Sequence, residues 1–295
     1  MEQGIATQTT SRAKHGSDDP VTKWAWIAAY ALLFVFGLSM IFPFAWTVGT
    51  SLKLSGEIFT YPPSLYPTHP RPANYVDLFN TVPFLLWFRN SVVVTGAATL
   101  GAVLSSTLVG YAFARLRYPG RDFFFGLCLA TMMLPGIVTL IPSFVLFRYL
   151  GWIDTFFPLI VPSWFGTPFF IFLARQHFRT IPREYDEAAR VDGASSWRIW
   201  WSLMLPMSTA LIGAIVIYSF IWNWNDFLAP LIYLNSVTNE TLALGLRGLQ
   251  NFYNTRWDLI MGGAVLMTLP MILVFFAAQQ FFIEGMSTLS GLAGR

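Results

Sequence analysis

Six long apolar stretches constrain the fold of this chain more than any other feature of its sequence. Five contain no charged residue, and the remaining one is interrupted once, by Asp226. In lipid, backbone amides must be bonded within their own segment, so an uncharged stretch of about 20 residues indicates a membrane-spanning helix. The sequence therefore predicts an all-α integral membrane protein with six transmembrane helices, at about residues 24–48, 91–114, 123–147, 155–174, 207–231 and 259–283.

The fourth stretch is the least secure of the six, because it is short and contains three prolines. Five spans is therefore the alternative count. Interior prolines such as Pro135 and Pro270 predict kinked helices, which membrane bundles tolerate because neighbouring groups bond the freed carbonyls. Residues 1–23 and 284–295 are predicted to form short polar tails outside the 24–283 membrane domain.

Composition excludes several classes of protein. Only 11% of the 295 residues are charged and the mean hydropathy is +0.54, whereas about a quarter of the residues in soluble domains are charged. The net charge of +3 comes from few basic residues placed between apolar spans, so we expect no nucleic-acid partner. The single cysteine, Cys128, can form neither an intrachain disulfide nor a cysteine-cluster metal site.

The sequence also lacks the usual signatures of catalysis. The three histidines are far apart, and no HExxH or GxSxG string occurs, so we expect neither an enzyme nor a metal site. A GxxxxGK[ST] phosphate loop, which would hold nucleotide phosphates, is absent as well. We therefore expect no cofactor in this chain, and if ATP drives it, another chain binds the ATP and Mg.

Basic residues predict the orientation in the membrane. Twelve of the 18 fall on one side of the predicted spans: Arg12, Lys14, Lys23, Arg115, Arg117, Arg121, Arg175, Arg179, Arg183, Arg190, Arg198 and Arg295. Cytoplasmic loops carry an excess of lysine and arginine. The sequence thus predicts a multi-pass protein of the cell membrane with both termini in the cytoplasm.

Two further segments have recognisable patterns. In the second span, Ala98, Ala102, Ser106, Gly110 and Ala114 share one helix face, which predicts a seam where another helix approaches closely; lining a pore is the alternative. The proline-rich segment 49–89 predicts an ordered extracytoplasmic loop, which either contacts another molecule or simply connects two spans.

The loop at residues 180–206, between the fourth and fifth spans, predicts a pair of short helices. Thr180 is a candidate cap for the first helix, and Gly193 is expected to end it, because glycine accepts the left-handed conformation found at helix ends. Ser195 or Ser196 can then cap the second helix, and Pro206 marks entry to the fifth span. The result is a rigid helix pair protruding from the membrane domain.

Specific residues in this loop resemble a known motif. Glu187, Ala188 and Ala189 are followed after three residues by Gly193, and after nine more by Leu203 to Pro206. This pattern is similar to the EAA loop of permease subunits in binding-protein-dependent ABC importers, and most similar to the smaller permease of maltose-type carbohydrate importers. One position departs from the family pattern, since Ala210 stands where a second proline is common.

The resemblance implies a type I importer permease fold and a complete set of partners. These are a second permease, expected to be a different chain, a dimer of ATPase subunits, an extracytoplasmic solute-binding protein and membrane lipid. It also implies that the ATPase docks on Glu187, Ala188, Ala189, Asp192, Gly193 and Ala194, with Pro206 leading into the fifth span. The solute implied is a sugar or a related compound.

Asn223, Asn225 and Asp226 are expected within the otherwise apolar fifth span. Polar groups in a membrane span usually face a bundle interior or a water path. These residues therefore either line the solute pathway or its outer gate, or hold the helix end against a neighbour. The functional alternative for the whole chain is a self-sufficient secondary transporter or channel, but such proteins place ionisable groups at mid-membrane, which this sequence does not.

Overall fold

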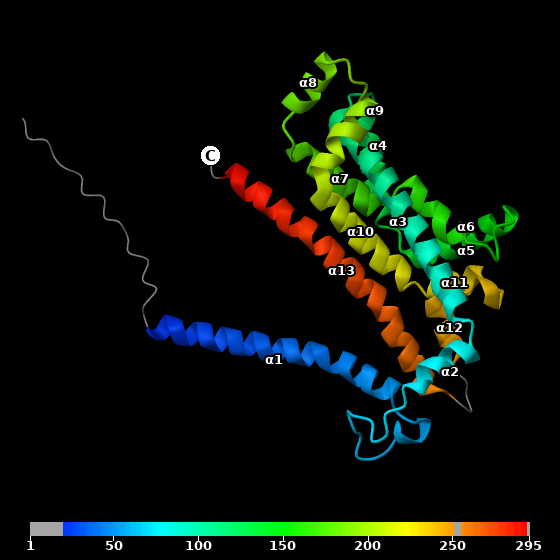
Figure 1. Cartoon of the computed structure of the whole chain (residues 1–295). Helices are drawn as coiled ribbons and strands as arrows, with labels where there is room; N and C mark the ends of the chain where they lie inside the picture. Colours follow the sequence, from blue (N-terminus) through cyan, green and yellow to red (C-terminus); the bar gives the residue numbers. More distant parts are fainter. Residues whose placement is uncertain (1–19, 251–254, 294–295) are drawn as a thin grey trace, which may run out of the picture.

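The computed structural model describes residues 20–250 and 255–293, and every regular element in these two ranges is helical (Figure 1). The longer helices are α1 (Pro20–Ser51), α3 (Phe84–Arg115), α4 (Arg121–Thr131), α5 (Gly136–Tyr149), α7 (Pro168–Thr180), α10 (Thr209–Trp224) and α13 (Trp257–Ala293). The shorter ones are α2 (Ala73–Thr81), α6 (Phe157–Ile160), α8 (Glu184–Val191), α9 (Ser196–Ile199), α11 (Leu228–Tyr233) and α12 (Leu242–Gly248). A 3₁₀ segment, Val161–Phe165, continues α6, and a π-helical segment, Trp200–Met204, continues α9.

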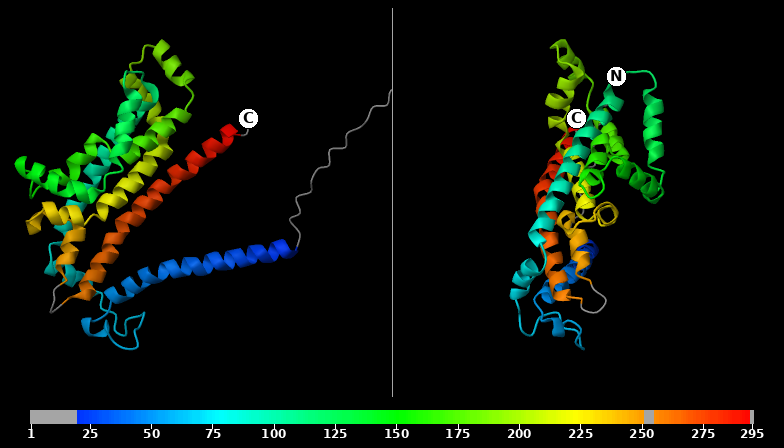
Figure 2. Two further views of the ribbon diagram at one scale, coloured as in Figure 1. Left: turned by 180° about the vertical axis from the view of Figure 1, so that it is seen from behind. Right: turned by 90° about the vertical axis from the view of Figure 1, so that its right-hand side faces the viewer.

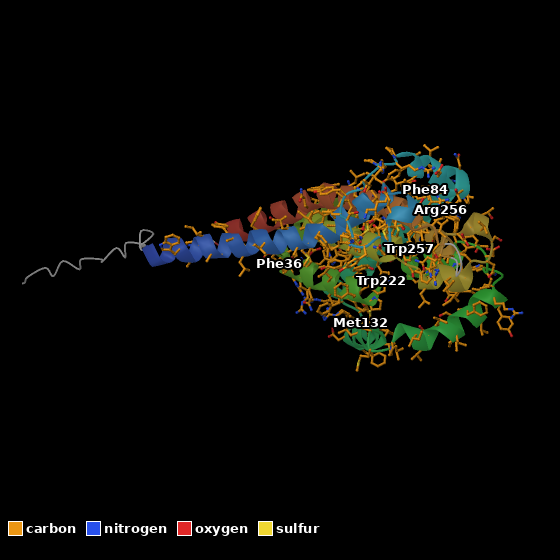
Figure 3. The ribbon with its side chains drawn as sticks, turned by 90° about the horizontal axis from the view of Figure 1, so that it is seen from below. Phe36, Phe84, Met132, Trp222, Arg256 and Trp257 are labelled. Carbon is orange, nitrogen blue, oxygen red and sulfur yellow. The ribbon has the colours of Figure 1, made fainter. Side chains whose placement is uncertain are left out.

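The helical membrane architecture predicted from the sequence is confirmed. Within the described ranges, five spans are long and apolar enough to cross a membrane, with Phe157–Thr180 counted as one, and a sixth results when α4 and α5 are joined. That third span is not the single straight helix we predicted, because α4 and α5 meet at an angle of 98°. Pro135 sits in extended conformation at the junction, where its ring disfavours helical backbone at the preceding residue. Met132, labelled in Figure 3, is the C-cap residue that follows α4 at this break.

Other spans also differ from the prediction. Helix α3 begins at Phe84 rather than near Ser91, because its first turns are anchored: the Trp87 indole donates to the Val237 carbonyl (3.0 Å) and Asn90 donates to the Thr238 carbonyl (2.8 Å). The fourth span is interrupted at Gly166, which has a φ of +92°.

The last two spans also differ. The fifth ends at Trp224 rather than near residue 231, and a separate helix, α11, follows it. Helix α13 continues through position 283, where we predicted the tail to begin, and ends at Ala293.

Helices α3, α7, α10 and α13 form the bundle that positions the rest of the molecule (Figures 1 and 2). The small-residue face of α3 packs inside it, since all five of its members are buried. A Cβ added at Gly110 would lie 2.5 Å from the Cβ of Ala174 on α7, so the two backbones approach too closely for any larger residue. The predicted packing seam is confirmed, and its partner is α7.

Helix α1 diverges from this bundle. It contacts α13 near its carboxyl-terminal end and then runs away from the other helices, as Figure 1 and the left view of Figure 2 show. None of its spanning window is buried within the chain, and side chains such as Phe36 project from it freely (Figure 3). An apolar helix of this kind requires lipid or another protein around it.

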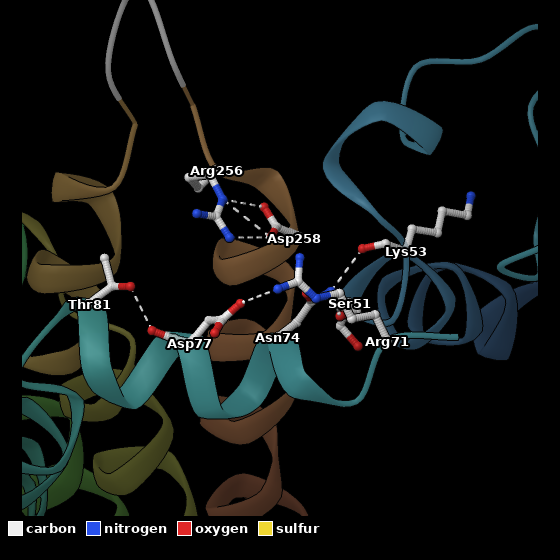
Figure 4. Close-up of polar contacts among 8 residues, drawn as sticks. All are labelled: Ser51, Lys53, Arg71, Asn74, Asp77, Thr81, Arg256 and Asp258. Carbon is white, nitrogen blue, oxygen red and sulfur yellow. Dashed lines mark hydrogen bonds and ion pairs between the residues drawn. The ribbon is translucent and has the colours of Figure 1, made fainter. Parts of the chain in front are cut away.

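The segment that follows α1 is ordered, as predicted. Asn74 on α2 is buried, and its amide donates to the carbonyls of Ser51 (2.9 Å) and Lys53 (2.8 Å), which ties α2 to the end of α1 (Figure 4). The Lys53 side chain folds back onto the Ser64 carbonyl, with its ammonium 5.0 Å from the centre of the Trp46 ring. This end of the bundle is therefore a rigid platform.

Candidate functional site: a protruding helix pair anchored in the bundle

Helices α8 and α9 form the predicted helix pair at one end of the bundle (Figure 1). Helix α8 ends at Val191, and Gly193 follows with a φ of +79°, so glycine ends the helix as predicted. The Ser195 hydroxyl accepts a bond from the Arg198 amide and caps α9, also as predicted. Thr180 does not cap α8, because it is the last residue of α7 and its hydroxyl donates to the His177 carbonyl.

Helix α8 has two different faces. Glu187, Ala188 and Val191 are exposed on the outer face, and the exposed residues Asp192 and Gly193 continue it. Ala189 and Ala194, in contrast, are partly buried and pack inward against the cluster that contains Tyr111 and Trp200. Of the six residues expected at a docking surface, the structure thus exposes four and turns two toward the bundle.

A buried ion pair anchors the inner face of α8. Arg115, the last residue of α3, lies 3.2 Å from the Asp186 carboxylate, and their side chains are only 4% and 9% exposed. Arg115 also donates to the Ile181 carbonyl. Burial raises the pKa of the Asp186 carboxyl above its ordinary value, while the neighbouring Arg115 acts in the opposite direction. We did not predict this pair, because nothing in the sequence indicates which acidic residue of α8 faces inward.

The second helix of the pair connects to α10. Trp200 and Met204 are buried in the cluster formed by α3, α7 and α10, whereas Trp197 and Trp201 remain exposed. Pro206 lies exposed at the start of the short turn that leads into α10. A bond between the His177 imidazole and the Ser208 hydroxyl (3.1 Å) fastens this turn to α7. The helix pair is therefore mechanically linked to three bundle helices.

The polar residues at the far end of α10 do not form one cluster. Asn223 donates to the Ser219 carbonyl (2.7 Å), and Asn225, which caps the helix, donates to the Ile221 carbonyl (2.8 Å). Asp226 lies beyond the helix, contrary to our prediction, and accepts a bond from the Ala229 amide at the start of α11. Asn225 and Asp226 thus have local roles in the chain reversal.

Asn223, however, lines a half-enclosed hollow of about 470 Å³ between α7 and α10. Its walls are aromatic and hydroxyl side chains, contributed by Ser163, Thr167, Phe169, Phe170, Tyr218, Ser219 and Trp222. The hollow lies beside Gly166 and Thr167, where the fourth span is not helical. Irregular backbone at membrane depth is tolerated where it is buried in protein or lines a cavity. The sequence offered only Asn223 as a sign of this hollow.

A third polar arrangement lies outside the spans. Asp154, in left-handed conformation with a φ of +61°, precedes α6 and accepts bonds from the Asn235 and Ser236 amides (both 2.9 Å) and from the Ser236 hydroxyl. These bonds lower the pKa of its carboxyl from 3.8 to about 2. The contact joins two loops more than 80 residues apart, so no local sequence pattern predicts it.

Within the described residues no group of three or more histidine, cysteine, aspartate or glutamate side chains is placed to hold a metal.

Comparisons with known proteins agree on one family. Residues 106–288 match the family model described as "Binding-protein-dependent transport system inner membrane component".

Two relatives show how far the similarity extends. The chain is 33% identical over 265 residues to the lactose transport system permease protein LacG of Rhizobium radiobacter, covering 88% of this chain and 94% of that one. It is 34% identical over 267 residues to the sn-glycerol-3-phosphate transport system permease protein UgpE of Brucella abortus, covering 86% and 94%.

The fold resembles a chain from the crystal structure of a bacterial ABC transporter involved in the import of the acidic polysaccharide alginate. The TM-score is 0.80 at 22% identity, and the match covers 90% of this chain and 98% of the other. At this level of identity the likeness concerns the fold alone.

Proposed function

Because this chain belongs to the family of binding-protein-dependent transport system inner membrane components, we propose that it forms half of a two-permease pore and is driven through α8 by a separate ATPase. It is a multi-pass inner membrane permease subunit of an ABC importer, not an enzyme, and ATP binds to its ATPase partners. The proposal concerns which residues of this chain transmit the movement and which meet the solute.

The observation that carries the proposal is the contrast between the two faces of α8. Its outer face offers the small side chain of Ala188 beside Glu187, where another protein can seat closely. Its inner face is held to α3 by the buried Arg115–Asp186 pair. Closure of an ATPase dimer on the outer face would therefore move α8 and α3 together, and α9 would pass the movement to α10.

Gly193→Asp tests this docking surface, and Gly151→Asp is its matched control. Both glycines have a positive φ, +79° and +69°, and at both an added Cβ meets no atom within 4 Å. The backbone strain is therefore similar, but Gly151 lies in the loop after α5, away from α8. Each variant is purified from gently solubilised membranes and its bound proteins are identified by mass spectrometry.

We expect Gly193→Asp to lose the ATPase and Gly151→Asp to retain it. Ala188→Trp, which fills the exposed side-chain-poor site without backbone strain, should behave like Gly193→Asp. Retention of the ATPase by both α8 variants would refute docking at α8. If the wild-type chain is recovered alone and transports solute in liposomes without ATP, the secondary transporter would become the better explanation.

The solute we propose is a sugar or a related polyol or sugar phosphate, as in the relatives named for lactose and sn-glycerol-3-phosphate transport. The hollow between α7 and α10 supports a direct contact, because aromatic rings and hydroxyl or amide groups are combined there. Trp222 is 79% exposed in this chain, so it faces a partner, lipid or the shared passage.

Two asparagines separate a pathway role from a structural one. Asn223→Ala and Asn225→Ala each remove a side-chain bond to the carbonyl four residues earlier, but only Asn223 lines the hollow. We expect Asn223→Ala to change the KM or rate of uptake severalfold and Asn225→Ala to leave both nearly unchanged. Equal effects of the two substitutions would refute the pathway role.

The remaining partners follow from the same assignment. We propose that a second, different permease completes the pore, that a solute-binding protein delivers the solute at the α2 platform, and that both termini lie in the cytoplasm. Support for a second permease comes from the bare apolar surface of α1. ATP-driven closure would turn the pore outward to receive the solute, and hydrolysis would restore the inward state.

A further inference from the structure

A basic hollow of about 510 Å³ lies between the α3–α4 turn and the start of α8. Three arginines line it, namely Arg117, Arg121 and Arg183, together with Tyr118 and Asp122. Arg121 is already paired with Asp122 (3.1 Å), and Arg175 approaches the same carboxylate at 3.8 Å. Asp122 is thus neutralised by two cations that neighbour it.

Arg117 and Arg183 have no direct ion-pair partner. Both are exposed, and across the described ranges neither side chain makes a hydrogen bond or an ion pair. They come from different loops, so the fold, not the sequence, brings two like charges to one hollow. Both arginines also line an adjoining hollow with Arg115, Asp186, Glu187 and Arg190. There Asp186 is paired with Arg115 and attracts Arg183 only at longer range. An anionic group of a ligand would relieve this repulsion.

The position of the hollow identifies the kind of anion. Arg117 lies two residues after the end of α3, Arg121 begins α4, and Arg183 lies three residues after the end of α7. All three arginines are therefore at the ends of membrane spans, the level at which lipid headgroups lie. Directly beyond them, Phe123 (72% exposed) and Phe124 (53% exposed) offer an apolar surface on α4.

We propose that this hollow binds the phosphate of an anionic phospholipid, with Arg117 and Arg183 on the headgroup and Phe123 and Phe124 beside the acyl chains. Basic pockets at span ends recognise such headgroups, and aromatic side chains gather at the membrane interface. The site lies next to α8 but is distinct from its outer face. This assignment does not depend on which side of the membrane this end of the bundle faces.

The test compares lipid binding by native mass spectrometry. The full chain, purified with the subunits that accompany it, is titrated with phosphatidylglycerol and with phosphatidylcholine of the same acyl chains. The variant Arg117→Gln/Arg183→Gln removes two unpaired arginines from the hollow. Its control, Arg89→Gln/Arg148→Gln, removes two exposed arginines whose side chains have no partner among the described residues; they lie near the opposite ends of α3 and of the α4–α5 span.

We expect the hollow variant to bind phosphatidylglycerol about 25-fold more weakly, since each of the two arginines near a lipid surface contributes about a factor of five. Binding of phosphatidylcholine should not change, and the control variant should match the wild type. Arg117→Lys/Arg183→Lys keeps both charges and should retain most of the affinity, which separates loss of charge from misfolding.

Three results would overturn the proposal. These are undiminished phosphatidylglycerol binding by the hollow variant, equal losses in the control variant, and displacement of the lipid by soluble glycerol phosphate at similar concentration. The third result would indicate a site for a soluble anion. If the first result came together with loss of the ATPase, it would indicate a site for acidic groups of a protein.

Discussion

Removing Arg115 should release α8 from the bundle, and Arg115→Met is the variant that shows it. Methionine retains much of the length of the arginine side chain but leaves the Asp186 carboxylate buried without its partner. Both side chains of the pair are more than nine-tenths buried, and the charged atoms are 3.2 Å apart. The bond to the Ile181 carbonyl is lost as well.

The degree of burial sets the expected magnitude. Removing one partner of a buried ion pair costs about 3–5 kcal/mol, because the remaining charge is uncompensated. The Arg71–Asp77 pair has a similar separation, 3.0 Å, but its side chains are 43% and 35% exposed. Exposed pairs contribute about 0–1 kcal/mol, so Arg71→Met is a matched control with a much smaller expected effect.

Hydrogen exchange measured by mass spectrometry reports the release directly. A loss of about 3–5 kcal/mol in the local opening free energy corresponds to a protection of residues 184–191 that is about 150-fold to 5000-fold lower. Arg71→Met should leave this peptide unchanged. ATP-driven uptake should fall in Arg115→Met, because α8 would no longer pull on α3.

A second substitution tests whether charge imbalance is the cause. Replacing a buried pair by apolar residues is often neutral, so Arg115→Met/Asp186→Leu should recover much of the protection that Arg115→Met loses. The reasoning would be refuted if α8 exchanged equally in Arg115→Met and in the wild type. It would be refuted equally if the double variant were as unprotected as the single one.

Two further substitutions test the packing seam and the outer loops. Gly110→Ala should lower the unfolding free energy by about 1–3 kcal/mol, because its Cβ would lie 2.5 Å from that of Ala174. Gly96→Ala is the control, because a Cβ there meets no atom within 4 Å, and it should not lower the unfolding free energy. Thermal unfolding in detergent measures both variants. Asp154 has its pKa lowered from 3.8 to about 2, so its contribution is complete above about pH 4 and is lost as the pH falls through about 2. The advantage in Tm of the wild type over Asp154→Asn should therefore shrink toward pH 2, and an advantage independent of pH would contradict this account.

Much of the architecture was accessible from the sequence because it depends on local chemistry. Apolar stretches long enough to cross a bilayer specify spanning helices whatever surrounds them, and the small-residue face of α3 had to meet a close neighbour. Gly193 and Ser195 end and begin helices through their own backbone and hydroxyl groups, so the junction between α8 and α9 was predictable. The start of α8 was not, because Thr180 ends α7 and α8 begins at Glu184.

The span boundaries failed where distant contacts decided them. Nothing near Phe84 indicates a helix start in the membrane, but bonds from Trp87 and Asn90 to the 237–240 loop hold the first turns of α3 in place. Pro135 predicted a kink, but a proline does not by itself specify an angle, and the 98° turn between α4 and α5 is known only from the structure.

The sequence by itself thus determined that this chain spans a membrane, that its helices pack through small residues, and that one of its loops resembles a motif of a recognisable family. Only the tertiary structure decided that Asp186 faces inward, that Asn223 and not Asn225 borders a hollow, and that Arg117 and Arg183 share one site. The physical reason is that hydropathy and capping act between neighbouring residues, whereas burial, ion pairing and cavities are made by residues that only the fold brings together.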